Sequence, residues 1–269
     1  MIALTLAAVR KHPTPARGIT LWWLGQAGFL LRSPGGKVLA LDPYLSNSCK
    51  AIGEQHGFDM NRQVPPPLAA GDLAGIDGYL LTHSHQDHLD PETLAGYRQA
   101  GGQGPYFAPA EAWERLQVLG VPASETTMVW PNKEIVLGDV RIRPTFAIPL
   151  GGDDLTHVGY LIFVQDGPTV YFTGDTAFEE VLPLAVEPHK PDVLVTVING
   201  AFRNLGPAEA AMLARKLGVK VVIPCHHDLF ADNCLPPQLL RTNLKLQGLG
   251  ETYQPLAHGE PFDYMKRDA

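Results

Sequence analysis

Hydrophobic residues near the start of the chain come in short runs separated by turn-forming residues. Residues 19–24, 28–31 and 37–42 are mostly apolar, and residues 33–36 read Ser-Pro-Gly-Gly. Such spacing is typical of antiparallel strands joined by tight turns. The pattern predicts a hairpin over residues 19–42.

The rest of the chain alternates further strands with helices. Two more hairpins are expected at residues 134–143 and 160–173, because each has a Gly-Asp or Asp-Gly turn between apolar runs. The β-branched runs at 193–198 and 219–224 have the composition of strands buried on both faces. A short strand is also expected at 78–82.

Three helices are indicated by capping residues and by periodic apolar positions. Asp90 before Pro91 combines an N-cap with a proline at the first helical position, so a helix should run from there towards Arg98. Residues 111–119 and 207–217 each carry apolar side chains at helical spacing. These helices lie between the predicted strands.

The order of these elements is hairpin, strand–helix units, hairpins and strand–helix–strand. This half-repeated order fits two mixed β-sheets packed face to face with helices outside better than a doubly wound parallel sheet. The predicted fold class is therefore α/β, in the broad sense that includes α+β. Because no linker-like change of composition divides the chain, we interpret residues 1–269 as a single domain.

Charge and composition narrow the class of partner. The net charge of −7 does not favour binding to nucleic acid or to an anionic membrane. No apolar run approaches the ~20 residues that span a bilayer. The three cysteines make an odd count without Cys-x-x-Cys spacing, so no disulfide framework is indicated and the cytoplasm is the expected compartment. We expect a small-molecule substrate, and a protein that is either a monomer or a homo-oligomer.

The densest chemical signal is the run at residues 82–88, which reads Thr-His-Ser-His-Gln-Asp-His after an apolar strand. Residues two apart in an extended backbone point to the same side, so His83 and His85 can bind one ion together. Asp87 and His88 diverge from that pair, as ligands of a second nearby ion would. Imidazole and carboxylate are ligands that divalent zinc, manganese and iron accept. The run therefore predicts a metal site rather than a solvated turn.

Further ligands are expected at the ends of other strands. Asp175 follows the predicted strand at 169–173 and is placed either to bridge two ions or to cap a helix. Of the neighbouring His226 and His227, alternation along the strand lets only one face the site, and we choose His226. Cys225 is expected to be a buried, inert thiol.

Three segments resemble the successive metal motifs of the metallo-β-lactamase superfamily: residues 82–88, 173–175 and 223–226. Four segments resemble more narrowly the L-ascorbate-6-phosphate lactonase-like branch, at residues 21–29, 42–46, 83–91 and 223–228. The resemblance implies a four-layer αββα sandwich with one or two divalent metal ions at one edge of the two sheets. The type member of that branch implies manganese, with zinc or iron as alternatives.

The resemblance also assigns six ligands to two metal positions: His83 and His85 to the first, Asp87 and His88 to the second, Asp175 as a bridge, and His226 to the second. Many members carry one more histidine, but residues 143–149 contain none. His157 is either its replacement or merely a loop histidine.

A metal-dependent hydrolase is the expected function. A divalent ion lowers the pKa of bound water to about 7, and the hydroxide would attack a carbonyl carbon while Asp87 or Asp175 orients it and moves its proton. Asp90 and Asp228 are expected to orient the imidazoles. The favoured substrate is a small lactone of a sugar acid or of its phosphate, since the ion can stabilise an alkoxide leaving group. The alternatives are a phosphodiesterase, a mononuclear-iron oxygenase and a metal-binding regulatory protein without turnover.

Substrate-binding residues are expected in and near the irregular segment 44–75. That segment is too long for a connector, so its part 44–71 should cover the metal cleft. Three residues are candidates to bind the substrate: Arg62, Arg203 and His227. The two arginines would hold an anionic group.

Overall fold

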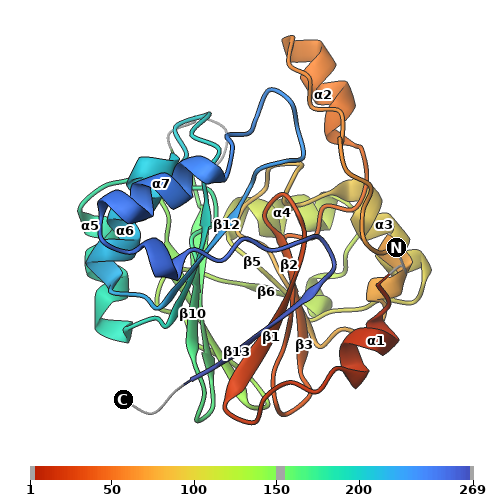
Figure 1. Cartoon of the computed structure of the whole chain (residues 1–269). Helices are drawn as coiled ribbons and strands as arrows, with labels where there is room; N and C mark the ends of the chain where they lie inside the picture. The colour runs from red at the N-terminus through yellow and green to blue at the C-terminus, as the bar shows by residue number, and fades with distance from the viewer. Residues whose placement is uncertain (1–3, 150–154, 267–269) are drawn as a thin grey trace.

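Two β-sheets packed face to face form the centre of the molecule (Figure 1). The structure, a computed structural model, describes residues 4–149 and 155–266. The strands of the first sheet are β1 (Gly18–Gly25), β2 (Gly28–Arg32), β3 (Val38–Leu41), β4 (Gly78–Leu80), β5 (Tyr106–Ala108), β6 (Thr126–Met128) and β13 (Pro261–Met265). Those of the second sheet are β7 (Ile135–Leu137), β8 (Val140–Phe146), β9 (Val158–Val164), β10 (Thr169–Phe172), β11 (Val193–Val197) and β12 (Val221–Cys225).

Both sheets mix parallel and antiparallel pairs. The first has the order β13-β1-β2-β3-β4-β5-β6, in which β13 to β3 pair antiparallel and β3 to β6 pair parallel. The second has the order β12-β11-β10-β9-β8-β7, in which β12 to β10 pair parallel and the rest antiparallel. The prediction of two mixed sheets is confirmed.

Helices cover the outer faces of the sheets and complete four layers (Figure 1). They are α1 (Leu6–Lys11), α2 (Cys49–His56), α3 (Pro91–Gln99), α4 (Ala110–Val118), α5 (Val181–Val186), α6 (Pro207–Leu217) and α7 (Gln238–Leu246). Short 3-10 helices lie at η1 (Ala70–Leu73), η2 (Ala123–Glu125), η3 (Glu187–His189) and η4 (Gly250–Thr252). No helix within the described ranges is long and apolar enough to cross a membrane.

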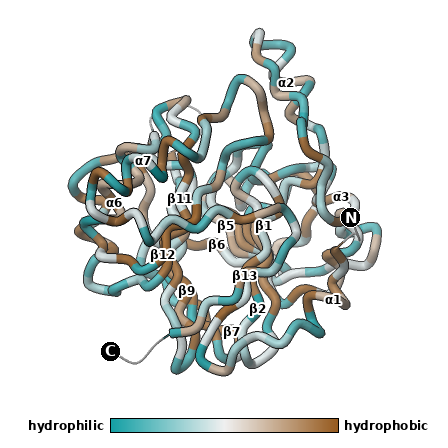
Figure 2. Tube along the Cα trace, in the orientation of Figure 1, coloured by the Kyte–Doolittle hydropathy of each residue, from teal (hydrophilic) through white to brown (hydrophobic). Residues whose placement is uncertain are grey.

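Strand β1 shows why the sequence favours this layered arrangement. Every one of its residues is buried, because both faces of the strand are covered. Leu21 and Trp23 pack into the core between the sheets, whereas Trp22 and Leu24 pack into the core shared with α3 and α4. Strands covered on both faces are apolar along their whole length. Figure 2 accordingly shows hydrophobic residues gathered along the central strands.

The predicted hairpins and helices agree with the structure, but the segment 44–75 does not stay irregular. It contains α2 and η1. Within α2 only Cys49 and Gly53 are buried, so the helix has no apolar face that a periodic pattern could reveal. The elements α1, α5, α7, β6 and β13 also lie outside the predicted set.

Tyr160 on β9 provides a first test of how the sheets are joined. Its hydroxyl donates a hydrogen bond of 2.7 Å to the carbonyl oxygen of Leu81, which follows β4 in the other sheet. We expect Tyr160→Phe to lower the free energy of unfolding by about 1–2 kcal/mol, because that buried carbonyl loses its donor. Urea denaturation measures the change.

Tyr79→Phe is the matched control. The hydroxyl of Tyr79 is also buried but has no hydrogen-bond partner among the described residues. Its removal should leave stability unchanged or raise it. Equal stability of Tyr160→Phe and the wild type would show that this bond does not hold the sheets together.

Candidate metal centre

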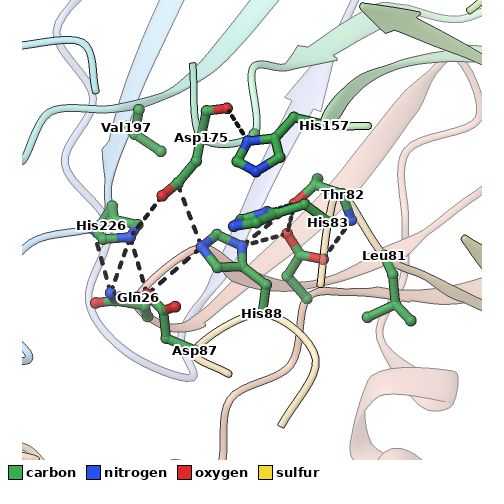
Figure 3. Close-up of polar contacts among 12 residues, drawn as sticks. Gln26, Leu81, Thr82, His83, Asp87, His88, His157, Asp175, Val197 and His226 are labelled. Carbon is green, nitrogen blue, oxygen red and sulfur yellow. Dashed lines mark hydrogen bonds and ion pairs between the residues drawn. The ribbon is translucent and has the colours of Figure 1, made fainter. Parts of the chain in front are cut away.

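The predicted ligands meet where strands of the two sheets end, and Figure 3 labels all of them except His85. The run 82–88 follows β4, Asp175 follows β10 and His226 follows β12. His157 precedes β9, which pairs antiparallel with β10, so the start of β9 lies beside the end of β10. Four segments far apart in the sequence therefore converge on one place.

The ligand-type atoms there form three overlapping groups, and within each group they lie within 4.8 Å of one another. The groups are His83 with His85 and His157, His83 with His88 and Asp175, and Asp87 with His88 and His226. Because the middle group shares one histidine with each of the others, Asp175 lies between the two outer groups. The arrangement suits one or two adjacent divalent ions.

The hydrogen bonds around the imidazole of His83 are those expected of a metal ligand. Its Nδ1 lies 3.0 Å from the hydroxyl of Thr82, whose own proton is donated to Asp42. Nδ1 therefore carries the ring proton, and Nε2 keeps a lone pair that is buried without a hydrogen-bond partner among the described residues. Burial holds the pKa of His83 well below its ordinary value, so the ring is neutral. A buried lone pair beside further imidazoles fits a divalent metal ion.

His88 is oriented by Asp42, a residue that the sequence analysis missed. Nδ1 of His88 lies 2.8 Å from Oδ2 of Asp42, and both side chains are fully buried. Asp42 also accepts hydrogen bonds from the backbone N–H and the hydroxyl of Thr82. A carboxylate on one ring nitrogen fixes the tautomer and aims the other nitrogen. Nε2 of His88 accordingly lies 3.3 Å from Oδ1 of Asp175.

Gln26, in the turn after β1, was also missed, and it joins Asp87 to His226. Its side-chain amide donates to Oδ2 of Asp87 at 2.8 Å and lies 3.0 Å from Nε2 of His226. Nε2 of His226 lies 3.2 Å from the same carboxylate oxygen of Asp87. Gln26 therefore fixes the relative position of the two groups.

Backbone strain accompanies this contact. The φ angles of Gln26 and His226 are 51° and 59°, and the backbone N–H of His226 donates to the carbonyl of Gln26. Non-glycine residues rarely adopt such angles, and those that do cluster at functional sites. β12 ends at Cys225, so a backbone turn, not the strand alternation we assumed, brings His226 rather than His227 to the cluster.

The cluster carries an excess of buried negative charge. Burial opposes ionisation of Asp87 and Asp175, but the nearby His88 and His226 outweigh it and hold the pKa of both carboxyls below the ordinary value. Burial alone would lower the pKa of His88, yet Asp175, Asp87 and Asp42 raise it well above the ordinary value. The surroundings thus favour a cation, which is either a proton on His88 or a divalent ion.

Asn204 holds the carboxylate of Asp175. Its amide donates to Oδ2 of Asp175 at 2.6 Å, and the side chain is buried. The two residues before it, Phe202 and Arg203, have φ angles of 52° and 64°. No spacing rule in the sequence pointed to Asn204, because an unusual loop conformation sets its position.

A cavity of about 390 Å³ opens onto the cluster. Four of the predicted metal ligands contribute to its lining: His85, Asp87, His157 and Asp175. The segment 44–71 supplies Cys49, Ile52, His56 and Met60, which agrees with the prediction that it covers the cleft. It does so largely through α2 rather than through an irregular loop.

The two arginines proposed for substrate binding do not line this cavity. The guanidinium of Arg62 donates to four backbone carbonyls instead, those of Leu24, Tyr44, Ser46 and Val64. Arg203 is exposed, and its neighbours Phe202 and Asn204 line the cavity in its place. The geometry therefore gives neither arginine the predicted role.

Three further assignments also need correction. His227 is buried against Trp23, with ring centroids 4.7 Å apart, and it is paired with Asp228, so it does not face the cavity. Asp228 therefore orients a histidine outside the cluster. Asp90 caps α3 and accepts hydrogen bonds from Ser48 and Thr93, not from a metal-site imidazole.

Comparison with known proteins identifies the family. The chain matches the beta-lactamase superfamily domain over residues 20–226 and therefore belongs to that superfamily. A relative from Myxococcus xanthus named "UPF0173 metal-dependent hydrolase" is 33% identical over 238 residues, which cover 84% of this chain and 76% of the relative. The narrower resemblance to a lactonase-like branch stays a prediction.

Solved structures share the fold. An isothiocyanate hydrolase from Delia radicum gut bacteria has a TM-score of 0.73 at 18% identity and covers 92% of this chain and 100% of its own. Igni18, a metallo hydrolase from Ignicoccus hospitalis, has a TM-score of 0.72 at 20% identity, covering 93% and 100%. At such identities the likeness concerns the four-layer architecture alone.

The role of Asp42 can be tested by metal affinity. We expect Asp42→Asn to weaken binding of manganese or zinc by about 10- to 100-fold, because an amide orients His88 less firmly than a carboxylate. Competition with a chelator measures the change. Asp90→Asn is the control, since Asp90 is equally buried but touches no metal-site imidazole. Equal losses in both variants would contradict a specific role for Asp42.

Proposed function

We propose that this chain, a metal-dependent hydrolase of the beta-lactamase superfamily, hydrolyses a small lactone. The observation that carries the proposal is a cavity of about 390 Å³ lined by the imidazoles and carboxylates of the cluster. Cavities of roughly 300–1,000 Å³ are typical of small-molecule sites. The sequence resemblance to the lactonase-like branch supports a cyclic ester.

The donor set contains nitrogen and oxygen atoms only, which suits manganese, zinc or iron. Cys225 packs in the core and Cys49 lines the cavity, but burial raises the pKa of both thiols, so neither supplies a thiolate there. A divalent ion held by the cluster supplies an activated water and a Lewis acid for the carbonyl oxygen. Among the possible ions we favour manganese, on the resemblance alone.

The protein's own groups supply the remaining steps. Gln26 holds Oδ2 of Asp87, so Oδ1 of Asp87 is the oxygen that takes the proton of the attacking water. Asn204 likewise holds Oδ2 of Asp175 and keeps its Oδ1 directed at His88. The side-chain oxygen of Asn233 accepts from Asn199, which leaves the amide N–H₂ of Asn233 as a donor to the substrate at the cavity wall.

A phosphodiester suits this cavity less well than a lactone. Within the described ranges, Arg115 is the one arginine or lysine in the lining, and its guanidinium donates to the carbonyl of Ser84 and to Oε1 of Gln86. Arg115 therefore stabilises the metal-binding run at residues 82–88. With Arg62 and Arg203 outside the lining, a phosphate group would find no free side-chain cation among the described lining residues beside the metal position, so we set the sugar-acid phosphate aside and keep the lactone.

Substrate class is tested with protein reconstituted with manganese or with zinc. We expect kcat/KM to be highest for lactones, lower for a β-lactam and lowest for bis-p-nitrophenyl phosphate. The physical reason is that the one arginine of the described lining, Arg115, is engaged with Ser84 and Gln86 and is not free to pair with the negative charge of the phosphodiester. A higher kcat/KM on the phosphodiester than on every lactone would favour a phosphodiesterase, and consumption of oxygen would favour an oxygenase.

Ligand identity is tested by substitution. His85→Ala and Asp175→Ala should lose lactone hydrolysis and tight metal binding together, because each removes a member of a three-group cluster. Metal content per chain is the measurement. His12→Ala is the control, since His12 is paired with Asp263 away from the cluster. Full metal content in both cluster variants would contradict the assignment.

A further inference from the structure

Apolar residues from two separate segments line the cavity, beside the exposed His56. Ile52 and Met60 belong to the segment 44–71, whose helix α2 projects from the body in Figure 1, while Pro149 and Phe202 belong to loops of the second half. Phe202 is 59% exposed and Ile52 is 37% exposed, so large apolar side chains face solvent beside the site. Exposed apolar groups that adjoin a binding cavity mark a surface that a ligand covers.

An aromatic contact joins the two sides. The rings of Phe58 and Phe202 lie edge to face, with centroids 5.8 Å apart, although Phe58 is itself 42% exposed. Phe202 adopts a φ of 52° and is followed by Arg203 at 64°. Two successive non-glycine residues in the left-handed region are unfavourable, and such conformations persist where the surrounding structure uses them. The strained turn places an aromatic ring at the mouth of the cavity.

The charge of the cavity lining also favours an apolar ligand group. Of the described lining residues, Arg115 alone carries a permanent positive charge, and it is engaged with the run that bears the ligands. The mouth residues Ile52, Met60 and Phe202 offer no hydrogen bond to hydroxyl or carboxylate groups. A heavily hydroxylated or anionic substituent that packed against these three side chains would lose its hydration there without compensation.

We propose that the substrate carries an alkyl or aryl substituent that packs between Ile52, Met60 and Phe202. The inference deepens the proposed function, because it rests on the lactone ring being held over the cluster. It also changes the expected substrate class, from a sugar-acid lactone to an apolar-substituted one. The substituent needs no polar partner, since burial of its surface supplies the affinity.

The test uses γ-lactones whose 5-alkyl chain grows from methyl to hexyl. In the manganese-loaded wild type, kcat/KM should rise with chain length, by up to about fourfold per methylene that becomes buried. Phe202→Ala and Ile52→Ala should flatten this rise. Ile52 lies on a half-exposed helix face, so its variant keeps the test valid if Phe202→Ala fails to fold. Leu246→Ala, at an exposed position of α7, is the control and should keep the wild-type slope.

The matching 5-alkyl lactams separate this inference from the lactonase proposal, since they bind without being readily hydrolysed. Calorimetric affinity should rise with chain length in the wild type and stay flat in Phe202→Ala. Rising lactam affinity without lactone turnover would support the apolar subsite and refute the lactonase. The subsite would be overturned if lactones were hydrolysed but neither kcat/KM for the lactones nor affinity for the lactams rose with chain length. A preference for a carboxylated lactone would overturn it as well. The subsite would also be overturned if affinity and kcat/KM did not change with chain length in the wild type and Phe202→Ala dissociated an oligomer. In that case a second copy of the chain would cover the mouth of the cavity.

Discussion

The structure depends on the burial of carboxylates and imidazoles in one cluster where the two sheets meet. Asp42, Asp87 and Asp175 are each at most 9% exposed, and each contacts a buried imidazole. Buried charges are unfavourable unless they are paired or neutralised, so the cluster needs a cation. A divalent ion meets that need and, at the same time, provides the Lewis acid that a hydrolase uses.

The rest of the fold serves to hold these groups in place. Strands of both sheets end at the same edge, and the buried hydroxyl of Tyr160 links one sheet to the other beneath the cluster. Left-handed backbone conformations at Gln26, Asp42 and His226 turn the chain so that three side chains enter the cluster from different strands. The energy stored in those turns is offset by the two hydrophobic cores on either side of the first sheet.

The parts of this arrangement that follow local rules could be predicted from the sequence. Hairpins with glycine turns, the capped helix after Asp90 and the ligand run at 82–88 carry their signals in adjacent residues. Asp42 was missed although it follows a strand, as Asp175 does, because its contact with His88 joins segments that are far apart in the sequence. Gln26 and Asn204 depend on positive φ angles in or beside their turns, and Arg62 depends on carbonyls contributed by distant segments. Such long-range or strained geometry leaves no periodic trace in the sequence.

The most direct test of metal binding at the cluster is a crystal structure of the metal-loaded protein with anomalous scattering recorded at the metal edge. We predict a peak within about 2.0–2.2 Å of Nε2 of His83, shared with neighbouring groups of the cluster. A second peak roughly 3.5–4 Å away, beside His226, would show two ions. Metal bound only elsewhere on the chain, or loaded crystals with no peak at the cluster, would show that the cluster is not the metal site.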